Sequence, residues 1–280
     1  MTEDVREAAT YGELAFDPTV PNVARIYDFL LQGKDNYAAD REAARRLLEA
    51  VPGAACAARE NRRFLGRAVW FLAREAGIRQ FLDIGTGLPT LGNVHEVAHA
   101  ADPLSHIAYV DNDPVVVTHA NALLADSVRV TAVQADLRGP DHLLSRSAVR
   151  AVIDFSQPVA VLMVAVLHFV ADREDPWSIV RTYMSMMVPG SYLVISHVTG
   201  DGTPAEAIRQ AAEIYQHSSA PGIARSRAQI ARFFHGLHMV APGLVAPGYW
   251  RCPAPAADPG PVLFYAGIGR KPDTAPEILR

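Results

Sequence analysis

A glycine-containing turn stands where an apolar strand pattern meets an apolar helix pattern, and its residue types can bind a ligand. The turn is LDIGTG, residues 82–87. A junction of this kind brings backbone N–H groups and a helix N-terminus to the carboxyl edge of a parallel sheet, and Gly85 and Gly87 let a ligand approach the backbone closely. Strand-to-helix turns also use glycine for geometry alone, so Gly85, Thr86 and Gly87 need support from other residues.

Two carboxylates follow the next two strand patterns and supply that support. Asp111 comes directly after residues 107–110, where a carboxylate can accept hydrogen bonds from both hydroxyls of a ribose. Asp136 comes just after residues 128–134, where it can accept a hydrogen bond from an adenine amino group. Three successive strand ends with suitable groups predict an adenosine-containing cofactor.

The spacing of the glycines separates two classes of cofactor. Nicotinamide dehydrogenases also place glycines after strand one and an acid after strand two, but their Gly-x-Gly-x-x-Gly fingerprint needs a glycine where this chain has Thr90. Pro89 comes before it, and a pyrophosphate has no obvious place to pack. Dehydrogenases also have no general need for an acid after strand three. The pattern favours S-adenosylmethionine and a methyltransferase over a dinucleotide and a dehydrogenase.

The elements that position these residues alternate between strand and helix patterns. Apolar spacing predicts helices at 61–76, 91–101, 114–125 and 177–187, and strands at 80–84, 107–110, 128–134, 159–166 and 192–196. Such alternation predicts an α/β, Rossmann-like sheet of parallel strands joined by right-handed helical crossovers. After helices at 204–217 and 226–234, the strands 239–245 and 262–268 should form an antiparallel closing pair around a loop rich in proline and glycine.

The first sixty residues show no strand pattern, and we expect them to form a helical N-terminal cap over a main domain at 61–280. The stretch 25–37 is too polar for a simple packing helix. It is either a charged surface helix or a lid over the cofactor.

In the lid interpretation, cationic and aromatic side chains reach the cofactor. Arg25 or Lys34 would meet its carboxylate, and Tyr27 or Tyr37 would meet its sulfonium or the substrate. Arg62 and Arg63 on the following helix can serve in the same way, although arginines on an amphipathic helix usually face water.

Two histidines follow strands four and five, where this fold presents a substrate. His168 can act as a general base, as a hydrogen-bond donor to the cofactor, or as a packed histidine in the cleft wall. His197 is a second candidate base on the same argument. The acidic group Asp172, Glu174 and Asp175 resembles a magnesium site, but carboxylates at a helix start are explained by its dipole, so we expect no metal.

Composition limits the partners. The chain has 280 residues, 50% of them hydrophobic and 20% charged, which suits one large core. A net charge of −4 and a pI of about 6.2 argue against nucleic acid as the main partner. The strongest apolar run, residues 159–167, is too short to span a bilayer, and the polar N-terminus does not resemble a signal peptide. We therefore expect a cytoplasmic protein with small-molecule partners and no membrane association.

Longer segments resemble a known family. The motifs LDIGTG, YVDNDP (109–114) and QADLR (134–138) resemble class I S-adenosylmethionine-dependent methyltransferases. A closer resemblance, to an actinobacterial family of S-adenosyl methyltransferases, rests on PNVARIYDFLLQGKDNYAADR (21–41), ENRRFLGRAV (60–69), VAVLHFV (164–170), PGSYLVISH (189–197) and YAGIGRKP (265–272). The resemblance implies a seven-stranded, mostly parallel sheet with an antiparallel last strand, and a helical cap.

The resemblance also implies roles for single residues. Gly85 and Gly87 would approach the methionine portion of the cofactor, and Asp111 would hold the ribose, with Thr86 and Asn112 as further cofactor-binding residues. Asp136 and Leu137 would frame the adenine, and Asp83 would brace the loop. Many methyltransferases have a third glycine at the position of Pro89, which makes this loop stiffer than usual.

Two functional hypotheses follow from these patterns. The first is transfer of a methyl group from S-adenosylmethionine to a small molecule, with S-adenosylhomocysteine as product. The second is a non-catalytic S-adenosylmethionine sensor or accessory protein. A nucleic-acid methyltransferase ranks below both, because the segment after strand four lacks the Asn/Asp-Pro-Pro-aromatic motif that holds a flipped base. The oligomeric state stays open, with a homodimer as one option.

Overall fold

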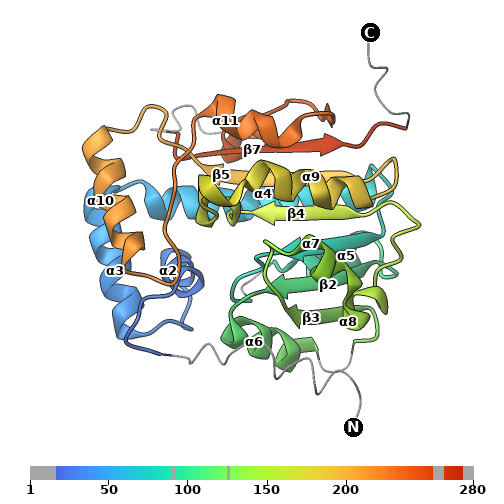
Figure 1. Ribbon diagram of the computed structural model, residues 1–280, viewed down its shortest axis with the longest axis horizontal. Coiled ribbons are helices and arrows are strands. Elements are labelled where there is room, and N and C mark those ends of the chain that lie inside the picture. The colour runs from blue at the N-terminus through green and yellow to red at the C-terminus, as the bar shows by residue number, and fades with distance from the viewer. Residues whose placement is uncertain (1–16, 90–91, 125–126, 255–261, 274–280) are drawn as a thin grey trace.

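The computed structural model describes residues 17–89, 92–124, 127–254 and 262–273. Within these ranges seven strands form one sheet in the order β3-β2-β1-β4-β5-β7-β6 (Figure 1). The strands are β1 Gln80–Ile84, β2 His106–Asp111, β3 Val130–Gln134, β4 Ala160–Val164, β5 Tyr192–Val198, β6 His238–Met239 and β7 Phe264–Arg270.

Strands β1 to β5 are parallel, and β7 runs antiparallel to β5 with Val194 opposite Ile268. This confirms the mostly parallel, seven-stranded sheet with a reversed last strand. Its partner β6 is shorter than the predicted strand at 239–245. Gly243 has a φ of +88° and donates its N–H to the Val240 carbonyl at 2.8 Å, so the chain turns after β6. It then returns to the sheet only through a single bridge at Val245.

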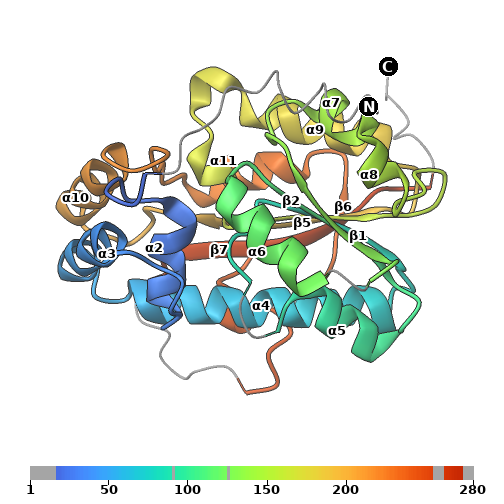
Figure 2. The same cartoon turned by 90° about the horizontal axis from the view of Figure 1, so that it is seen from below.

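Helices cover both faces of the sheet (Figure 2). One face carries α4 Ala54–Arg74, α5 Val94–Ala101 and α6 Pro114–Leu124. The other carries α7 Pro140–Ser145, α8 Ser147–Arg150, α9 Pro176–Met186 and α11 Arg227–Ala231. Short 3-10 segments occur at Leu167–Phe169 (η1), Asp172–Glu174 (η2), Arg232–Phe234 (η3) and Pro247–Tyr249 (η4).

The strands serve both faces because successive side chains point in opposite directions. Leu82 and Ile84 of β1 join the apolar cluster under α7 to α9, whereas Phe81 joins the cluster under α4 to α6. All five residues of β1 are buried. Because β1 lies between β2 and β4, its end and the turn that follows it lie in the middle of the carboxyl edge.

A separate lobe lies beyond the carboxyl ends of the parallel strands (Figure 1). It contains α2 Val23–Leu30, α3 Ala38–Ala50 and α10 Ala205–Gln216. These helices share an apolar cluster with the start of α4, made of Ile26, Leu30, Ala43, Ala44, Leu47, Ala58 and Ile214. Two features differ from the predicted cap. Helix α4 runs across the expected boundary at residue 60, and α10 joins the lobe from the second half of the chain. Residues 1–16 of the predicted cap lie outside the described ranges.

No helix within the described ranges combines the length and the apolar character needed to cross a bilayer.

Candidate functional site

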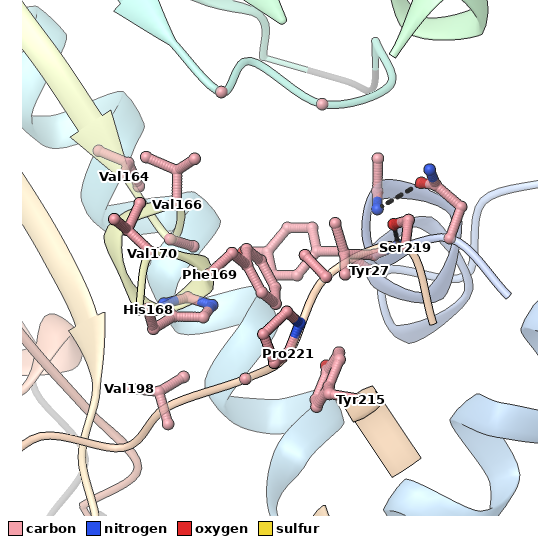
Figure 3. A pocket seen from close by; sticks show the side chains of 18 of the residues that line it. Tyr27, Val164, Val166, His168, Phe169, Val170, Val198, Tyr215, Ser219 and Pro221 are labelled. Carbon is pink, nitrogen blue, oxygen red and sulfur yellow. Dashed lines mark hydrogen bonds between the residues drawn. The ribbon is translucent and has the colours of Figure 1, made fainter. Parts of the chain in front are cut away.

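A cavity of about 630 Å³ lies between the carboxyl edge of the sheet and the lobe of α2, α3 and α10. Its wall includes the turn after β1, the ends of β2 and β3, α2, α4, the η1 segment and residues 219–224 (Figure 3). The cavity therefore brings the strand ends singled out in the sequence together with segments from the second half of the chain.

The turn after β1 has the backbone shape that its glycines allow. Gly85 has a φ of +73° and Gly87 one of +66°, a region that side chains with a Cβ disfavour. A Cβ on Gly85 would also lie 2.3 Å from Cγ2 of Val166. Thr86 donates its hydroxyl to Oδ2 of Asp83 at 2.9 Å, and burial raises the pKa of Asp83 to about 6. Asp83 thus braces the loop from below, while the backbone of Gly85 and Gly87 faces the cavity.

Asp111 connects this turn to β2. Its Oδ2 accepts the Gly87 N–H at 2.9 Å, and its Oδ1 accepts the Asp113 N–H at 2.9 Å. A carboxylate has about four lone-pair positions, so each oxygen retains capacity for a further donor. Burial raises the pKa of Asp111 to about 6. Asn22 at the start of α2 donates its side-chain amide to Asp113 at 2.8 Å, which ties the lobe to the end of β2.

Asp136 lines the cavity, but its carboxylate already has a partner. Arg138 binds it through two nitrogens and also forms an ion pair with Glu174 at 2.8 Å. Burial raises the pKa of Asp136, but the hydrogen bonds from Arg138 outweigh that effect and hold the pKa below its usual value. Leu137 and the exposed Asn112 also line the cavity. The structure therefore leaves less free hydrogen-bonding capacity at Asp136 than at Asp111.

Two residues of α2 were candidates for binding the cofactor. Arg25 is buried, forms an ion pair with Asp40 at 2.8 Å and donates to the Val20 carbonyl at 2.9 Å. Its guanidinium thus has a structural role in joining α2 to α3. Tyr27 donates its hydroxyl to the Ala58 carbonyl at 3.1 Å and accepts from the Asn61 amide at 2.9 Å. Its ring lies in the cavity wall (Figure 3).

His168 lies in the cavity wall at η1, directly after β4 (Figure 3). The residue is 6% exposed, and its ring nitrogen Nδ1 is buried with no hydrogen-bond partner among the described residues. Burial lowers the pKa of His168 well below its usual value, and nearby His197 and Arg225 act in the same direction. The imidazole is therefore neutral at physiological pH.

His197 has a different environment. Its Nε2 lies 2.8 Å from the Arg225 guanidinium and its Nδ1 lies 2.7 Å from the Val198 carbonyl. Because a guanidinium only donates, Nε2 must accept and Nδ1 must carry the proton. Burial lowers the pKa of His197 to about 3. Both nitrogens are used within the fold, and His197 is not among the described residues of the cavity wall. The structure gives no support to its predicted role as a base.

With this geometry in place, the chain can be compared with known proteins. A family model described as S-adenosyl methyltransferase matches residues 10–272. The chain belongs to the S-adenosyl methyltransferase family. It is therefore an S-adenosylmethionine-dependent methyltransferase, as the sequence motifs predicted. No curated protein matches its sequence.

Solved structures agree with this family. A DUF574 family protein from Streptomyces avermitilis is 39% identical, with a TM-score of 0.87, and the match covers 91% of this chain and 99% of that protein. A protein from Thermobifida fusca described as a candidate methyltransferase is 41% identical, with a TM-score of 0.86 and coverage of 94% and 99%. An O-methyltransferase family protein from Burkholderia thailandensis, 16% identical with a TM-score of 0.52, covers 82% of this chain and 62% of its own. It shares the fold alone.

Unpaired buried polar atoms gather around the cavity of this methyltransferase. Among the described residues, six buried side-chain atoms have no hydrogen-bond partner, on Asn61, Arg62, Ser105, His168, Thr203 and Trp250. All except Ser105 and Trp250 are residues of the cavity wall. An unpaired buried polar atom costs about 1–3 kcal/mol. Such a concentration at one cavity points to a polar ligand there.

Some residues of the site were missed or underrated in the sequence. Arg62 lies beside Asp83, Thr86 and Gly87, and its Nε is one of the unpaired atoms. The sequence predicted that Arg62 lies on a helix, but it did not predict that the side chain faces the turn after β1. Thr203, Tyr215 and residues 219–224 reach the cavity through α10 and the segments around it, and no local pattern indicates that long-range packing.

The acidic group after β4 serves the fold. Glu174 pairs with Arg138, Asp172 pairs with Arg225 at 2.6 Å, and Asp175 caps α9 by accepting the Ser178 N–H. In the described part of the chain, no three His, Cys, Asp or Glu side chains are grouped in a way that could hold a metal ion.

Proposed function

We propose that this methyltransferase transfers the methyl group of S-adenosylmethionine to a small molecule held in the cavity between the sheet and the α2, α3 and α10 lobe. The observation that carries the proposal is the volume and position of that cavity. About 630 Å³ lies within the range of small-molecule sites, and the lobe stands over the strand ends at which a cofactor would bind.

The residues around the turn after β1 and the end of β2 suit the cofactor. The open backbone at Gly85, Thr86 and Gly87 would take its methionine portion, and Asp111 would accept from the ribose hydroxyls. Arg62, whose unpaired Nε is buried beside this turn, replaces Arg25 as our candidate partner for the carboxylate. The guanidinium donates to Oδ1 of Asn93 at 3.2 Å through a terminal nitrogen, so its Nε is the group left to bind an anionic part of a ligand.

The adenine would lie at the end of β3. Leu137 and Asn112 line the cavity there, and Asp136 is fixed by Arg138. We propose that Asp136 acts chiefly by shaping this wall, since Arg138 occupies both of its oxygens.

When bound, S-adenosylmethionine supplies a methyl group on a sulfonium, which is already activated for transfer. The protein must orient the acceptor and, if the accepting atom carries a proton, remove that proton. His168 is our candidate for that task. His168 lines the cavity after β4, and its Nδ1 has no hydrogen-bond partner among the described residues. Its imidazole is neutral, so a ring nitrogen can accept a proton.

Calorimetry and a turnover assay test the proposal together. S-adenosylhomocysteine should bind the wild-type protein and should bind Asp111→Asn much more weakly. Asp141→Asn on α7, outside the described cavity wall, is the matched control and should bind as the wild type does. Incubation with S-adenosylmethionine and a metabolite mixture should yield methylated small molecules by mass spectrometry. Methylation confined to added protein or nucleic acid would contradict a small-molecule acceptor.

A further inference from the structure

The cavity wall divides by charge along the sequence. Its described residues up to Arg138 include carboxylates and guanidiniums, among them Asp28, Arg62, Asp83, Asp111, Asp136 and Arg138. Arg173 and Glu174 also line the wall, and Glu174 pairs with Arg138 at 2.8 Å. From Val198 to Phe264, none of the described residues in the wall carries a charge. We call the wall around Asp83, Asp111 and Arg138 the charged end, and the stretch from Val198 to Phe264, with His168 and Phe169 packed against it, the uncharged end. The charged end suits a charged cofactor, and the stretch from Val198 to Phe264 offers a charged ligand no ionic partner.

The uncharged end is rich in aromatic rings. Phe169 lies between His168 and Tyr215, with ring centroids 4.3 Å and 5.7 Å away, and Phe264 lies 6.0 Å from His168. Val198 and Pro221 lie on the same side of the pocket (Figure 3). Rings that meet edge to face or at a tilt form walls on which a further planar ring can pack.

The hydrogen-bonding side chains at this end are the imidazole of His168 and the hydroxyls of Thr199, Thr203, Tyr215 and Ser219. Thr199 and Ser219 each accept a backbone N–H at 3.1 Å, whereas His168 and Thr203 each have a buried atom with no partner among the described residues. The other side chains in the wall from Val198 to Phe264 are apolar. Most of a ligand here would therefore have to be apolar. A single hydroxyl would suit the imidazole, which can exchange hydrogen bonds with it as donor or acceptor.

From this division we infer that the methyl acceptor is an uncharged aromatic molecule whose hydroxyl group lies against His168. A carboxylate or ammonium at this end would lose its hydration without gaining a counter-charge, which costs far more than placing a neutral ring there. The inference rests on the proposed function, because it assumes that the charged end holds the cofactor.

The transfer is balanced with the groups named. A bond forms between the hydroxyl oxygen and the methyl carbon while the bond from that carbon to sulfur breaks, and its electron pair stays on sulfur to give the neutral thioether S-adenosylhomocysteine. The hydroxyl proton passes to the imidazole of His168 and then to water. The positive charge moves from the sulfonium to the imidazolium, so the net charge within the cavity does not change.

A matched set of bicyclic probes tests the inference on protein saturated with S-adenosylhomocysteine. Calorimetry at pH 7 would compare 2-naphthol with 2-naphthoate, 2-naphthylmethylammonium and the saturated alcohol 2-decalol. We expect 2-naphthol to bind roughly tenfold or more tightly than each of the others, because charge burial and loss of ring packing both weaken binding. Equal or tighter binding of any of the three, or no binding of 2-naphthol, would overturn the inference.

A substitution makes the test local. Pro221→Lys adds a cation to the exposed rim of the uncharged end and should shift the preference from 2-naphthol toward 2-naphthoate by several-fold, roughly the effect of one partly exposed charge pair. Val128→Lys adds the same charge at an exposed position outside the described wall and should leave the ranking unchanged. An unchanged ranking in Pro221→Lys would contradict the placement of the aromatic acceptor at the uncharged end of the cavity. If S-adenosylhomocysteine itself fails to bind, the proposed function fails; if it binds and the probes rank otherwise, only this inference fails.

Discussion

The two ends of the cavity differ in how they are built. At the charged end, Asp83, Asp111 and the turn at Gly85 and Gly87 hold one another by hydrogen bonds of about 2.9 Å, all within short motifs at strand ends. At the uncharged end, Phe169, Tyr215 and Phe264 are brought together from three distant segments. In the proposed function, local motifs at strand ends bind a cofactor common to many enzymes, whereas the acceptor would be enclosed by packing that can vary without disturbing those motifs.

His168 lies at the uncharged end, and its substitution should have the largest effect on turnover. His168→Ala should lower kcat by about 10²- to 10⁴-fold, the usual contribution of a general base, with little change in affinity for S-adenosylhomocysteine. Single-turnover kinetics and calorimetry would measure the two effects. A kcat within tenfold of wild type, or a parallel loss of cofactor affinity, would remove His168 from the proposed chemistry.

Asp111 tests the charged end in the same way. Asp111→Asn should weaken binding of S-adenosylhomocysteine by roughly 100-fold, since hydrogen bonds to charged groups contribute about 1.5–3 kcal/mol each. Asp136→Asn should have a much smaller effect, because Arg138 already occupies that carboxylate. Titration calorimetry of both variants would show the ranking. Equal losses of affinity in the two variants would mean that Asp111 and Asp136 contribute equally to cofactor binding.

The pH dependence of cofactor affinity sharpens the assignment to Asp111. Burial raises its pKa to about 6, and only the ionised form can accept from two hydroxyls without donating. Affinity should therefore be constant above about pH 7 and fall as the pH drops through 6, by roughly tenfold per unit below the pKa. Asp111→Asn should flatten this fall. A fall that persists in the variant would assign the titration to another group, such as Asp83.

Arg62 gives the smallest expected effect and the most local one. Arg62→Met should weaken binding of S-adenosylhomocysteine about tenfold, the value of one charge-assisted hydrogen bond. Binding of 5′-methylthioadenosine, which lacks the amino-acid portion, should not change. If both ligands weaken equally, Arg62 supports the fold of the turn and does not contact the carboxylate.

The sequence predicted the charged end better than the uncharged one for a physical reason. Gly85, Gly87 and Asp111 owe their positions to the ends of β1 and β2, which short, continuous apolar runs make visible in the chain. Helices α7 and α8 were missed because each is too short for a helical period to register. The strand expected at 239–245 shortened to two residues, because a turn at Gly243 takes the chain out of the sheet.

Side-chain partners were beyond what local patterns indicate. Arg25 was a cofactor candidate until its ion pair with Asp40, on the next helix, became visible. One argument predicted both His168 and His197 as candidate bases, but His197 lies within β5 and both of its ring nitrogens are hydrogen-bonded, to Arg225 and to the Val198 carbonyl. Nδ1 of His168 has no partner among the described residues. A pattern of residue types predicts where a side chain stands, and the tertiary structure decides whether it is free.

A crystal structure with bound S-adenosylhomocysteine would show where the cofactor lies. We expect the ribose hydroxyls to lie on Asp111, the adenine to lie near Leu137, and the sulfur to face the part of the cavity bounded by Val166 and His168. This placement would be contradicted by a ribose bound to any other residue, or by a sulfur that points away from the uncharged end of the cavity.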